Sequence, residues 1–448
     1  MDLTLQIYVA GDWHDAVLLS LPDPAMGRRG KIRLDYEQDY ALQWLFQDGE
    51  HACCMGFPVE IFCSYGGDSW PAFIDDILPS GASRRYWVNH LGLQNLSPLE
   101  QDGVLLHQGV IAPIGNLRIK ESLPVMAPGS QLVARRFSLA QVRDRDTDFL
   151  EYAQQMGAAS GGATGAGGEA PKLLLRCSAE EQVWIDTYQD DQTCPDRHYL
   201  VKFPRGQRTP IDCDILRAEY HYYQELAALG IPTIDTAAMR LEEGARYPSL
   251  WLPRFDVAFK AGQLQRYGLE SVYSLLNKPP GSYLSHLDVL AALIDLLSHQ
   301  YLVREGRRQF DPAEFAIEWV KRDMLNVVFG NSDNHGRNVA LLKTPEGIGL
   351  SPVFDFAPMK ADPEGVVRTI KWPSPLEEGG NFNWWLIADR LKPWVAPDRL
   401  LPALGELANR LLGLRERLHS RGVPPSILDF PSLGFPYLDE KILSWKLP

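Results

Sequence analysis

The sequence has few cysteines and no long apolar run, and each absence excludes a class of protein. Only 6 of the 448 residues are cysteines. None belongs to a C-x-x-C pair or to a Cys/His cluster with zinc spacing, so the common structural zinc sites are excluded. No stretch approaches the ~18 consecutive apolar residues that span a bilayer. Residues 1–7 lack the basic and apolar regions of a signal peptide. These features predict a soluble cytoplasmic protein with reduced thiols and no membrane partner.

Positive charge is also scarce. The chain carries 44 Lys and Arg against 57 Asp and Glu, a formal net charge of -13. Because affinity for nucleic acid depends largely on neutralising phosphates, we expect no direct nucleic-acid binding. Arg135, Arg136, Arg143 and Arg145 form a local basic strip. Such a strip is more often a solvated face than a binding site.

The rest of the composition is that of an ordinary globular protein, and 448 residues suggest two or three units or one two-lobed enzyme with an extra domain. Apolar residues make up 45% and charged residues 23% of the chain, as in ordinary globular proteins. The pattern predicts an α+β fold with two kinase-like lobes. We expect a β-rich N-terminal subdomain at 1–125, an N-lobe-like unit at 126–275 with a Gly-rich loop, and an all-helical C-terminal half at 276–448. Apolar spacing predicts helices over 213–229, 316–328 and 400–418.

The most informative motif follows the helix predicted at 316–328. Asp333 and Asn338 are five residues apart, the Asp-x-x-x-x-Asn separation of protein-kinase catalytic loops. Phosphoryl transfer needs a carboxylate to accept the hydroxyl proton and an amide oxygen to hold Mg²⁺. Asp355, 22 residues after Asp333, supplies a second magnesium ligand. Asp323 is expected on the helix surface or behind the site.

ATP also requires a cation and a phosphate cradle. Lys202 ends an apolar strand, and Glu219 lies 17 residues later in a helix, where it can pair with Lys202 as in kinases. Residues 157–172 are rich in glycine and alanine and can cradle phosphates, although such stretches are more often linkers.

At these motifs the chain resembles the HipA-type serine/threonine kinase toxins, and in its long Gly/Ala loop their stand-alone branch. The resemblance also covers the stretches 73–79, 201–204 and 254–256. It implies a serine/threonine protein kinase that uses ATP and Mg²⁺, regulates growth through an aminoacyl-tRNA synthetase, and has a possible antitoxin partner. Residue by residue, it implies the following roles: Asp333 as catalytic base; Asn338 and Asp355 as magnesium ligands; Gly167, Gly168, Lys172, Lys202, Glu270, Val272 and His335 at ATP; Glu219 as the lysine's partner; and Ser160 or Thr164 as autophosphorylation site.

Two other functions remain open from the residues. A small-molecule kinase usually has His before the catalytic Asp, whereas here Ser332 precedes Asp333 and His335 follows it. A nucleotide-binding pseudokinase or scaffold is favoured only by the unusual Gly/Ala loop. Phosphate transfer to small alcohols would indicate the first, and ATP binding without transfer the second.

Overall fold

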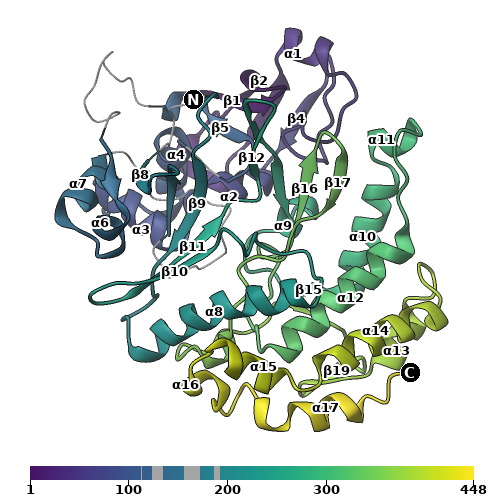
Figure 1. The fold of residues 1–448 in the computed structure, drawn as a ribbon. Helices are drawn as coiled ribbons and strands as arrows, with labels where there is room; N and C mark the ends of the chain where they lie inside the picture. The colour runs from purple at the N-terminus through teal and green to yellow at the C-terminus, as the bar shows by residue number, and fades with distance from the viewer. Residues whose placement is uncertain (112–113, 124–134, 156–171, 186–191) are drawn as a thin grey trace.

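The computed structural model describes residues 1–111, 114–123, 135–155, 172–185 and 192–448, and it has the α+β fold expected (Figure 1). The predicted boundaries at residues 125 and 275 remain predictions. Within the described residues, no helix is long and apolar enough to cross a membrane.

The N-terminal part is built on a five-stranded antiparallel sheet in the order β4-β3-β2-β1-β5. Its strands are β1 (Asp2–Val9), β2 (Asp12–Ser20), β3 (Ile32–Tyr36), β4 (Ser64–Gly67) and β5 (Leu117–Ile119). Its helices are α1 (Gln38–Gln43), α2 (Phe73–Ile77), α3 (Gly81–His90) and α4 (Pro98–Gln108). Alternate residues of β1, including Leu3, Leu5 and Ile7, are buried in a core of their own, as a half-buried strand requires.

A second sheet of six strands has the order β10-β11-β9-β7-β8-β6. These strands are β6 (Phe137–Ser138), β7 (Lys172–Cys177), β8 (Gln182–Trp184), β9 (Arg197–Lys202), β10 (Arg240–Glu243) and β11 (Pro248–Pro253). Around them lie α6 (Leu139–Arg143), α7 (Thr147–Gln155) and α8 (Pro210–Ala228), followed by the hairpin β12 (Val257–Lys260) and β13 (Gln263–Arg266). Helix α8 begins at a capping box formed by Thr209 and Asp212, and Gly230, at φ 68°, follows its end.

The C-terminal half is mainly helical but not entirely so. Strand β14 (Gly268–Ser271) pairs with β16 (Ala340–Thr344), which pairs with β17 (Gly347–Leu350). Short pairs join β15 (Leu284–Ser285) to β18 (Ile370–Lys371) and β19 (Glu377–Glu378) to β20 (Asn381–Phe382). The prediction of an all-helical C-terminal half was therefore wrong, because this half also contains strands. Strand β16 pairs with β17 and, across the predicted boundary at 275, with β14.

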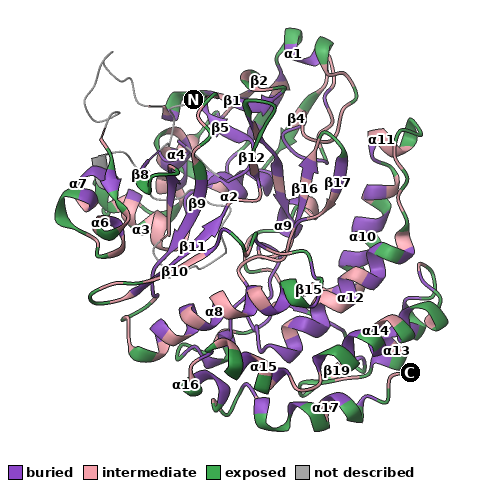
Figure 2. Cartoon of the chain, viewed as in Figure 1, coloured by how far each residue is buried: buried purple, intermediate pink, exposed green. Residues whose placement is uncertain are grey.

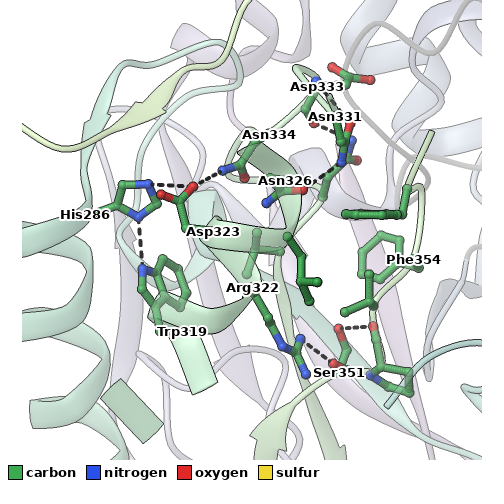
Figure 3. Close-up of a pocket in the computed structure, with 16 residues that line it drawn as sticks. His286, Trp319, Arg322, Asp323, Asn326, Asn331, Asp333, Asn334, Ser351 and Phe354 are labelled. Carbon is green, nitrogen blue, oxygen red and sulfur yellow. Dashed lines mark hydrogen bonds and ion pairs between the residues drawn. The ribbon is translucent and has the colours of Figure 1, made fainter. Parts of the chain in front are cut away.

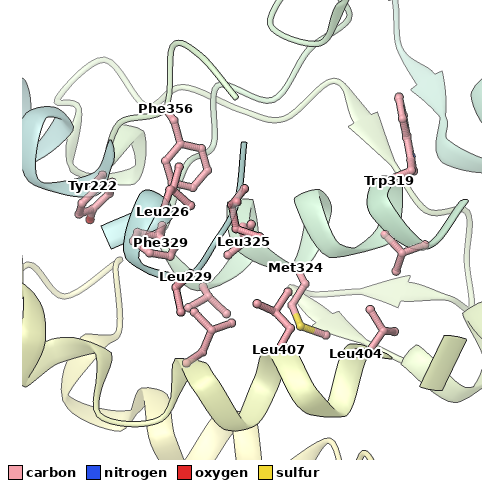
Figure 4. Close-up of a cluster of buried hydrophobic side chains, with 14 of the residues drawn as sticks. Tyr222, Leu226, Leu229, Trp319, Met324, Leu325, Phe329, Phe356, Leu404 and Leu407 are labelled. Atoms are coloured by element: carbon pink, nitrogen blue, oxygen red, sulfur yellow. The ribbon is translucent and has the colours of Figure 1, made fainter. Parts of the chain in front are cut away.

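The helices of this half are α9 (Val272–Leu275), α10 (His286–Ser298), α11 (Tyr301–Arg304), α12 (Pro312–Val328), α13 (Trp384–Arg390), α14 (Pro397–Leu411), α15 (Leu414–Arg421), α16 (Pro425–Leu428) and α17 (Leu438–Ser444). The helix expected over 400–418 is split in two, because Gly413 takes a left-handed φ of 69° between α14 and α15. Figure 2 shows that α12 is largely buried. Leu404 and Leu407 of α14 share its core with Met324 and Phe329 (Figure 4).

Candidate active site

A tight loop after α12 presents the predicted catalytic residues. Gly330, at φ 69°, ends the helix, and a Cβ there would meet Leu433 at 2.2 Å. Farther along the loop, a Cβ on Gly336 would lie 2.6 Å from the ring of Tyr273. Both glycines are thus required by close packing, which fixes the path of the loop between them.

Hydrogen bonds within the loop set the directions of its polar side chains. Asn338 Nδ2 donates to the main-chain oxygen of Asp333 at 2.9 Å, while Asn338 Oδ1 is buried and has no hydrogen-bond partner. His335 Nδ1 accepts from the N–H of Arg337 at 3.2 Å. His335 Nε2 lies 3.2 Å from Asp333 Oδ1, but the angle is too poor for a hydrogen bond. The loop therefore presents the carboxylate of Asp333 and the buried, unsatisfied amide oxygen of Asn338.

Behind the loop, a buried network holds Asn334 in place (Figure 3). Asp323 accepts from Asn334 Nδ2 at 3.3 Å, from Arg368 Nη2 at 2.6 Å and from Trp372 Nε1 at 2.7 Å. Its side chain also lies 3.3 Å from His286. Burial alone would raise the pKa of Asp323, but Arg368 and His286 outweigh it and hold the pKa below its ordinary value. Asp323 is therefore not a helix-surface residue; it supports the loop from behind.

Facing the loop is a cluster of two lysines and two carboxylates. Lys202 Nζ lies 2.6 Å from Glu219 Oε1 and also bonds to Asp355 Oδ1. Lys172 Nζ lies 3.3 Å from Asp355 Oδ2. Tyr223 donates to Glu219 at 2.9 Å. The ion pair expected between Lys202 and Glu219 is thus present, whereas Lys172, expected in the phosphate loop, begins strand β7.

The charges of this cluster are tightly coupled. Burial would raise the pKa of Asp355, but Lys172 and Lys202 more than offset it and lower the pKa. Burial would lower the pKa of Lys202, but Asp355 and Glu219 raise it above its usual value. For Lys172, burial and the neighbouring Lys202 outweigh Asp355, and its pKa is lowered. Asp355 is thus ionised and Lys202 protonated at neutral pH.

Two cavities meet at this cluster. One, of about 520 Å³, is lined by Lys172, Lys202, Glu219, Asp333 and Asp355 among others, and so joins the loop to the lysines. The second, of about 460 Å³, has an apolar wall and shares Lys172, Lys202 and Asp355 with the first. Its other described lining residues are Ile114, Leu200, Ile234, Leu252, Pro253, Arg254, Phe255, Asp256, Leu269 and Phe354. An apolar wall with a few convergent charged groups is typical of a small-molecule site.

The structure does not bring every predicted residue to these cavities. Glu270, Val272, His335 and Asn338 line neither of them, although Asn338 lines a neighbouring cavity together with Asp333. On β14 the side chain of Leu269 faces the apolar cavity, so Glu270 points the other way, where it accepts from Lys343 at 3.2 Å and from Met55 N–H at 3.0 Å. Gly167, Gly168, Ser160 and Thr164 lie outside the described residues.

Sequence reasoning missed two contributors. Pro253–Asp256 line the apolar cavity, although Arg254-Phe255-Asp256 was noted only as a resembling strand. The N-terminal part also reaches the loop: Arg337 Nη2 donates to the main-chain oxygen of Asp75 at 3.0 Å. Next to it, Asp76 accepts from the N–H and hydroxyl of Ser271 at 2.9 and 2.7 Å. The family resemblance covers the stretch 73–79, but nothing in the sequence indicates that this stretch contacts Arg337.

Comparison with known proteins places the chain in a family. The model of the HipA-like C-terminal domain matches residues 164–411. The toxin YjjJ of Escherichia coli (strain K12) is 28% identical over 228 residues, which are 50% of this chain and 45% of that toxin, so the match spans less than half of the relative.

One solved structure shows the same fold. HipA in the toxin–antitoxin complex of HipA, HipB and operator DNA from Shewanella oneidensis MR-1 superposes with a TM-score of 0.62 at 16% identity, covering 99% of this chain and 96% of that one. The Helicobacter pylori proinflammatory kinase CtkA gives a TM-score of 0.39 at 15% identity, over 63% and 92% of the two chains, which is too low to carry an argument. Because the family model covers more than half of the residues, the chain belongs to the HipA-like family.

Proposed function

We propose that this protein is a serine/threonine protein kinase that transfers the γ-phosphate of ATP to a protein hydroxyl with Mg²⁺. One observation carries the proposal: Lys202, held by Glu219, shares a single cavity with Asp355 and Asp333. Phosphoryl transfer needs this set, a cation for the phosphates, a carboxylate for the metal and a carboxylate for the acceptor.

The nucleotide occupies both cavities in this proposal. Its adenine enters the apolar cavity, where it contacts Leu252 and Leu269. The main chain of Pro253–Asp256 lies at the edge of the adenine. Its phosphates lie at Lys202 and Lys172, the two cations shared with the neighbouring cavity. Glu219 keeps Lys202 extended toward them, because both are buried and 2.6 Å apart.

The residues also fit a magnesium ion. Asn338 Oδ1 is a buried oxygen without a partner, and such an atom is costly unless a ligand satisfies it. Among the described residues no three His, Cys, Asp or Glu gather into a metal site. Mg²⁺ suits such sparse ligation, since it binds one or two protein oxygens together with phosphates and water. Asn338 and Asp355 would hold the ion, which neutralises phosphate charge when bound.

Asp333 orients the acceptor hydroxyl and accepts its proton. His335 accepts the Arg337 N–H at Nδ1, and its Nε2 lies 3.2 Å from Asp333 Oδ1 without a hydrogen bond. Asp333 itself lines the cavity that also contains Lys202 and Asp355. Ser160 and Thr164 remain proposed autophosphorylation sites.

The biological setting follows the relatives. One is named a toxin, and another was solved with an antitoxin and operator DNA. We therefore extend the proposal to a cytoplasmic, toxin-type growth regulator with an antitoxin partner, acting on translation through an aminoacyl-tRNA synthetase. The net charge of -13 still argues against direct nucleic-acid binding by this chain.

Radiolabelled ATP and Mg²⁺ test the proposal, with the phosphate-free wild type, Asp333→Gln and the exposed-site control Asp295→Gln. Removal of a general base costs about 10²–10⁴-fold in rate. We expect Asp333→Gln to lose transfer by that amount and to bind ATP as tightly as the wild type, while the control stays fully active. Equal transfer by Asp333→Gln would contradict the assignment, and transfer to small alcohols but to no protein would favour a small-molecule kinase.

A further inference from the structure

A wide groove opens next to the candidate active site. It lies between α3, α7 and the chain that follows β9, and it encloses about 1330 Å³ including open solvent. We call it the basic groove; its described lining residues are Ala82, Ser83, Arg85, Tyr86, Arg145, Leu150, Ala153, Lys172, Leu173, Phe203, Pro204, Gly206 and Arg208.

The basic groove leads directly to the proposed catalytic residues. Lys172, Phe203 and Pro204 line both this groove and the cavity that contains Asp333 and Asp355. A polypeptide lying in the groove is therefore next to the cavity that contains Asp333.

Its charge is opposite to that of the chain as a whole. Arg85, Arg145, Lys172 and Arg208 line it, and no Asp or Glu is among its described lining residues. The protein nevertheless carries a net charge of -13. Lys172 is paired with Asp355, but the three arginines gathered in one hollow of an acidic protein raise the local concentration of anionic ligands.

Two of these arginines have no carboxylate partner in the described part of the chain. Arg145 lies over the ring of Phe203 at 4.9 Å and Arg208 over that of Tyr247 at 5.4 Å. Arg145 Nε is buried without an acceptor, and burial together with the charge of Arg208 lowers the pKa of Arg145. Arg143, in contrast, pairs with Asp144 at 3.0 Å. Of these two neighbouring arginines, Arg145 is thus the one that lines the groove without a carboxylate partner among the described residues.

The walls favour a peptide over a nucleic acid. Binding of single-stranded nucleic acid relies on aromatic faces that stack with bases. Here Phe203 is buried and covered by Arg145, and the ring of Tyr86 is already stacked on His90 at 5.6 Å. The remaining wall includes Leu150, Ala153 and Leu173. Small apolar side chains between arginines suit alternating apolar and acidic residues of a peptide.

We propose that the basic groove binds an acidic segment of the protein acceptor, beside the hydroxyl residue that receives the phosphate. This inference rests on the proposed kinase function and names the substrate class for that site. Arginine side chains bind carboxylates with two parallel hydrogen bonds, so Arg145 and Arg208 select Asp and Glu in the acceptor.

The test measures binding without turnover, in the full-length protein carrying Asp333→Gln. The probes are a fluorescent peptide with one serine flanked by glutamates, the same peptide with glutamines, and a single-stranded RNA of equal charge. We expect the glutamate peptide to bind about tenfold more tightly than the glutamine peptide, with an affinity that falls as salt rises. Equal affinities for the two peptides would overturn the proposal whatever the variants do.

Arg145→Gln/Arg208→Gln is the test variant, and Arg390→Gln/Arg410→Gln, on the exposed surface, makes the same change in net charge. The first should lose the preference for glutamate and keep its ATP affinity, which reports folding; the second should change neither. Equal losses in both, or tighter binding of the RNA that depends on Arg145 and Arg208, would overturn the proposal. Because no step requires catalysis, an inactive wild type that still binds the glutamate peptide would count against the kinase function alone.

Discussion

At the scale of single residues, the candidate site contains side chains that are fixed in position while some of their polar atoms lack a hydrogen-bond partner. The amide nitrogen of Asn338 donates a hydrogen bond within the loop, whereas its amide oxygen has no hydrogen-bond partner. Asp355 takes a left-handed φ of 52°, which is uncommon outside glycine. Strained and unsatisfied groups of this kind cluster at functional sites, because the surrounding structure is what maintains them.

The free oxygen of Asn338 gives a prediction about metal dependence. Asn338→Ala should raise the Mg²⁺ concentration for half-maximal transfer by about tenfold or more, the range typical when a group that supports a metal site is lost. Metal-free ATP binding should be unchanged. A magnesium titration of initial rates measures this effect, with Asn409→Ala on the exposed face of α14 as control. An unchanged magnesium requirement would remove Asn338 from the proposed ligand set.

At the scale of elements, the loop at 330–338, which carries the proposed catalytic residues, is supported from two sides. Helix α12 carries it, and α2 of the N-terminal part contacts it through Asp75 and Arg337. Asp76, next in α2, is fully buried, and burial raises its pKa to about 6 despite Arg337 and Ser271. The N-terminal part therefore helps to shape the site rather than only flanking it.

Asp76 gives a prediction about stability and pH. Because its folded-state pKa is raised from 3.8 to about 6, the folded protein binds a proton more tightly than the unfolded chain. This contribution is present at low pH and is lost as pH rises through about 6. Between pH 4.5 and 7 the wild type should lose roughly 2 kcal/mol of unfolding free energy relative to Asp76→Asn.

Urea unfolding of both proteins at the two pH values measures this difference. Asp39→Asn, at an exposed position of α1, is the control and should show the same pH dependence as the wild type. Parallel curves for Asp76→Asn and the wild type would show that Asp76 does not titrate in this interval.

The same elements show how far sequence reasoning reaches. The apolar spacing of 316–328 located α12, and every residue from Ala316 to Val328 used in that pattern is buried. Local spacing also placed Asp333 and Asn338 on one loop. Non-local pairing was out of reach: the pattern does not show that β14 pairs with β16, so Glu270 was assigned to the nucleotide while Leu269 faces that cavity.

At the scale of the whole molecule, one large core joins parts that are distant in sequence. Residues as far apart as Met55, Leu226, Met324 and Leu404 belong to the same buried cluster. Figure 4 shows α14 packed along α12, so the C-terminal helices support the helix that ends in the catalytic loop. Stability and the geometry of the site are therefore coupled through packing.

This coupling predicts a large but indirect effect of one core substitution. Leu404 is fully buried, so Leu404→Ala should lower the free energy of unfolding by about 2–5 kcal/mol. Far below the melting temperature, the KM for ATP should not change, because Leu404 lines neither cavity. Thermal unfolding and steady-state kinetics check both parts, and the exposed Leu443→Ala should stay within about 0.5 kcal/mol of the wild type. A raised KM for ATP would mean that α14 transmits its packing to the nucleotide cavity.

The double attachment of Asp355 has a consequence for the order in which ligands bind. With neither ligand present, Lys202 and Lys172 neutralise this carboxylate, so a divalent cation arriving alone competes with two ammonium groups. In the proposed function, nucleotide phosphates would attract the same two lysines and release the carboxylate. Each ligand would then remove the other's competitor, and we expect their binding to be positively cooperative. By thermodynamic linkage, ATP must raise the affinity for Mg²⁺ by the same factor by which Mg²⁺ raises the affinity for ATP. The protein would then bind little metal until the nucleotide arrives.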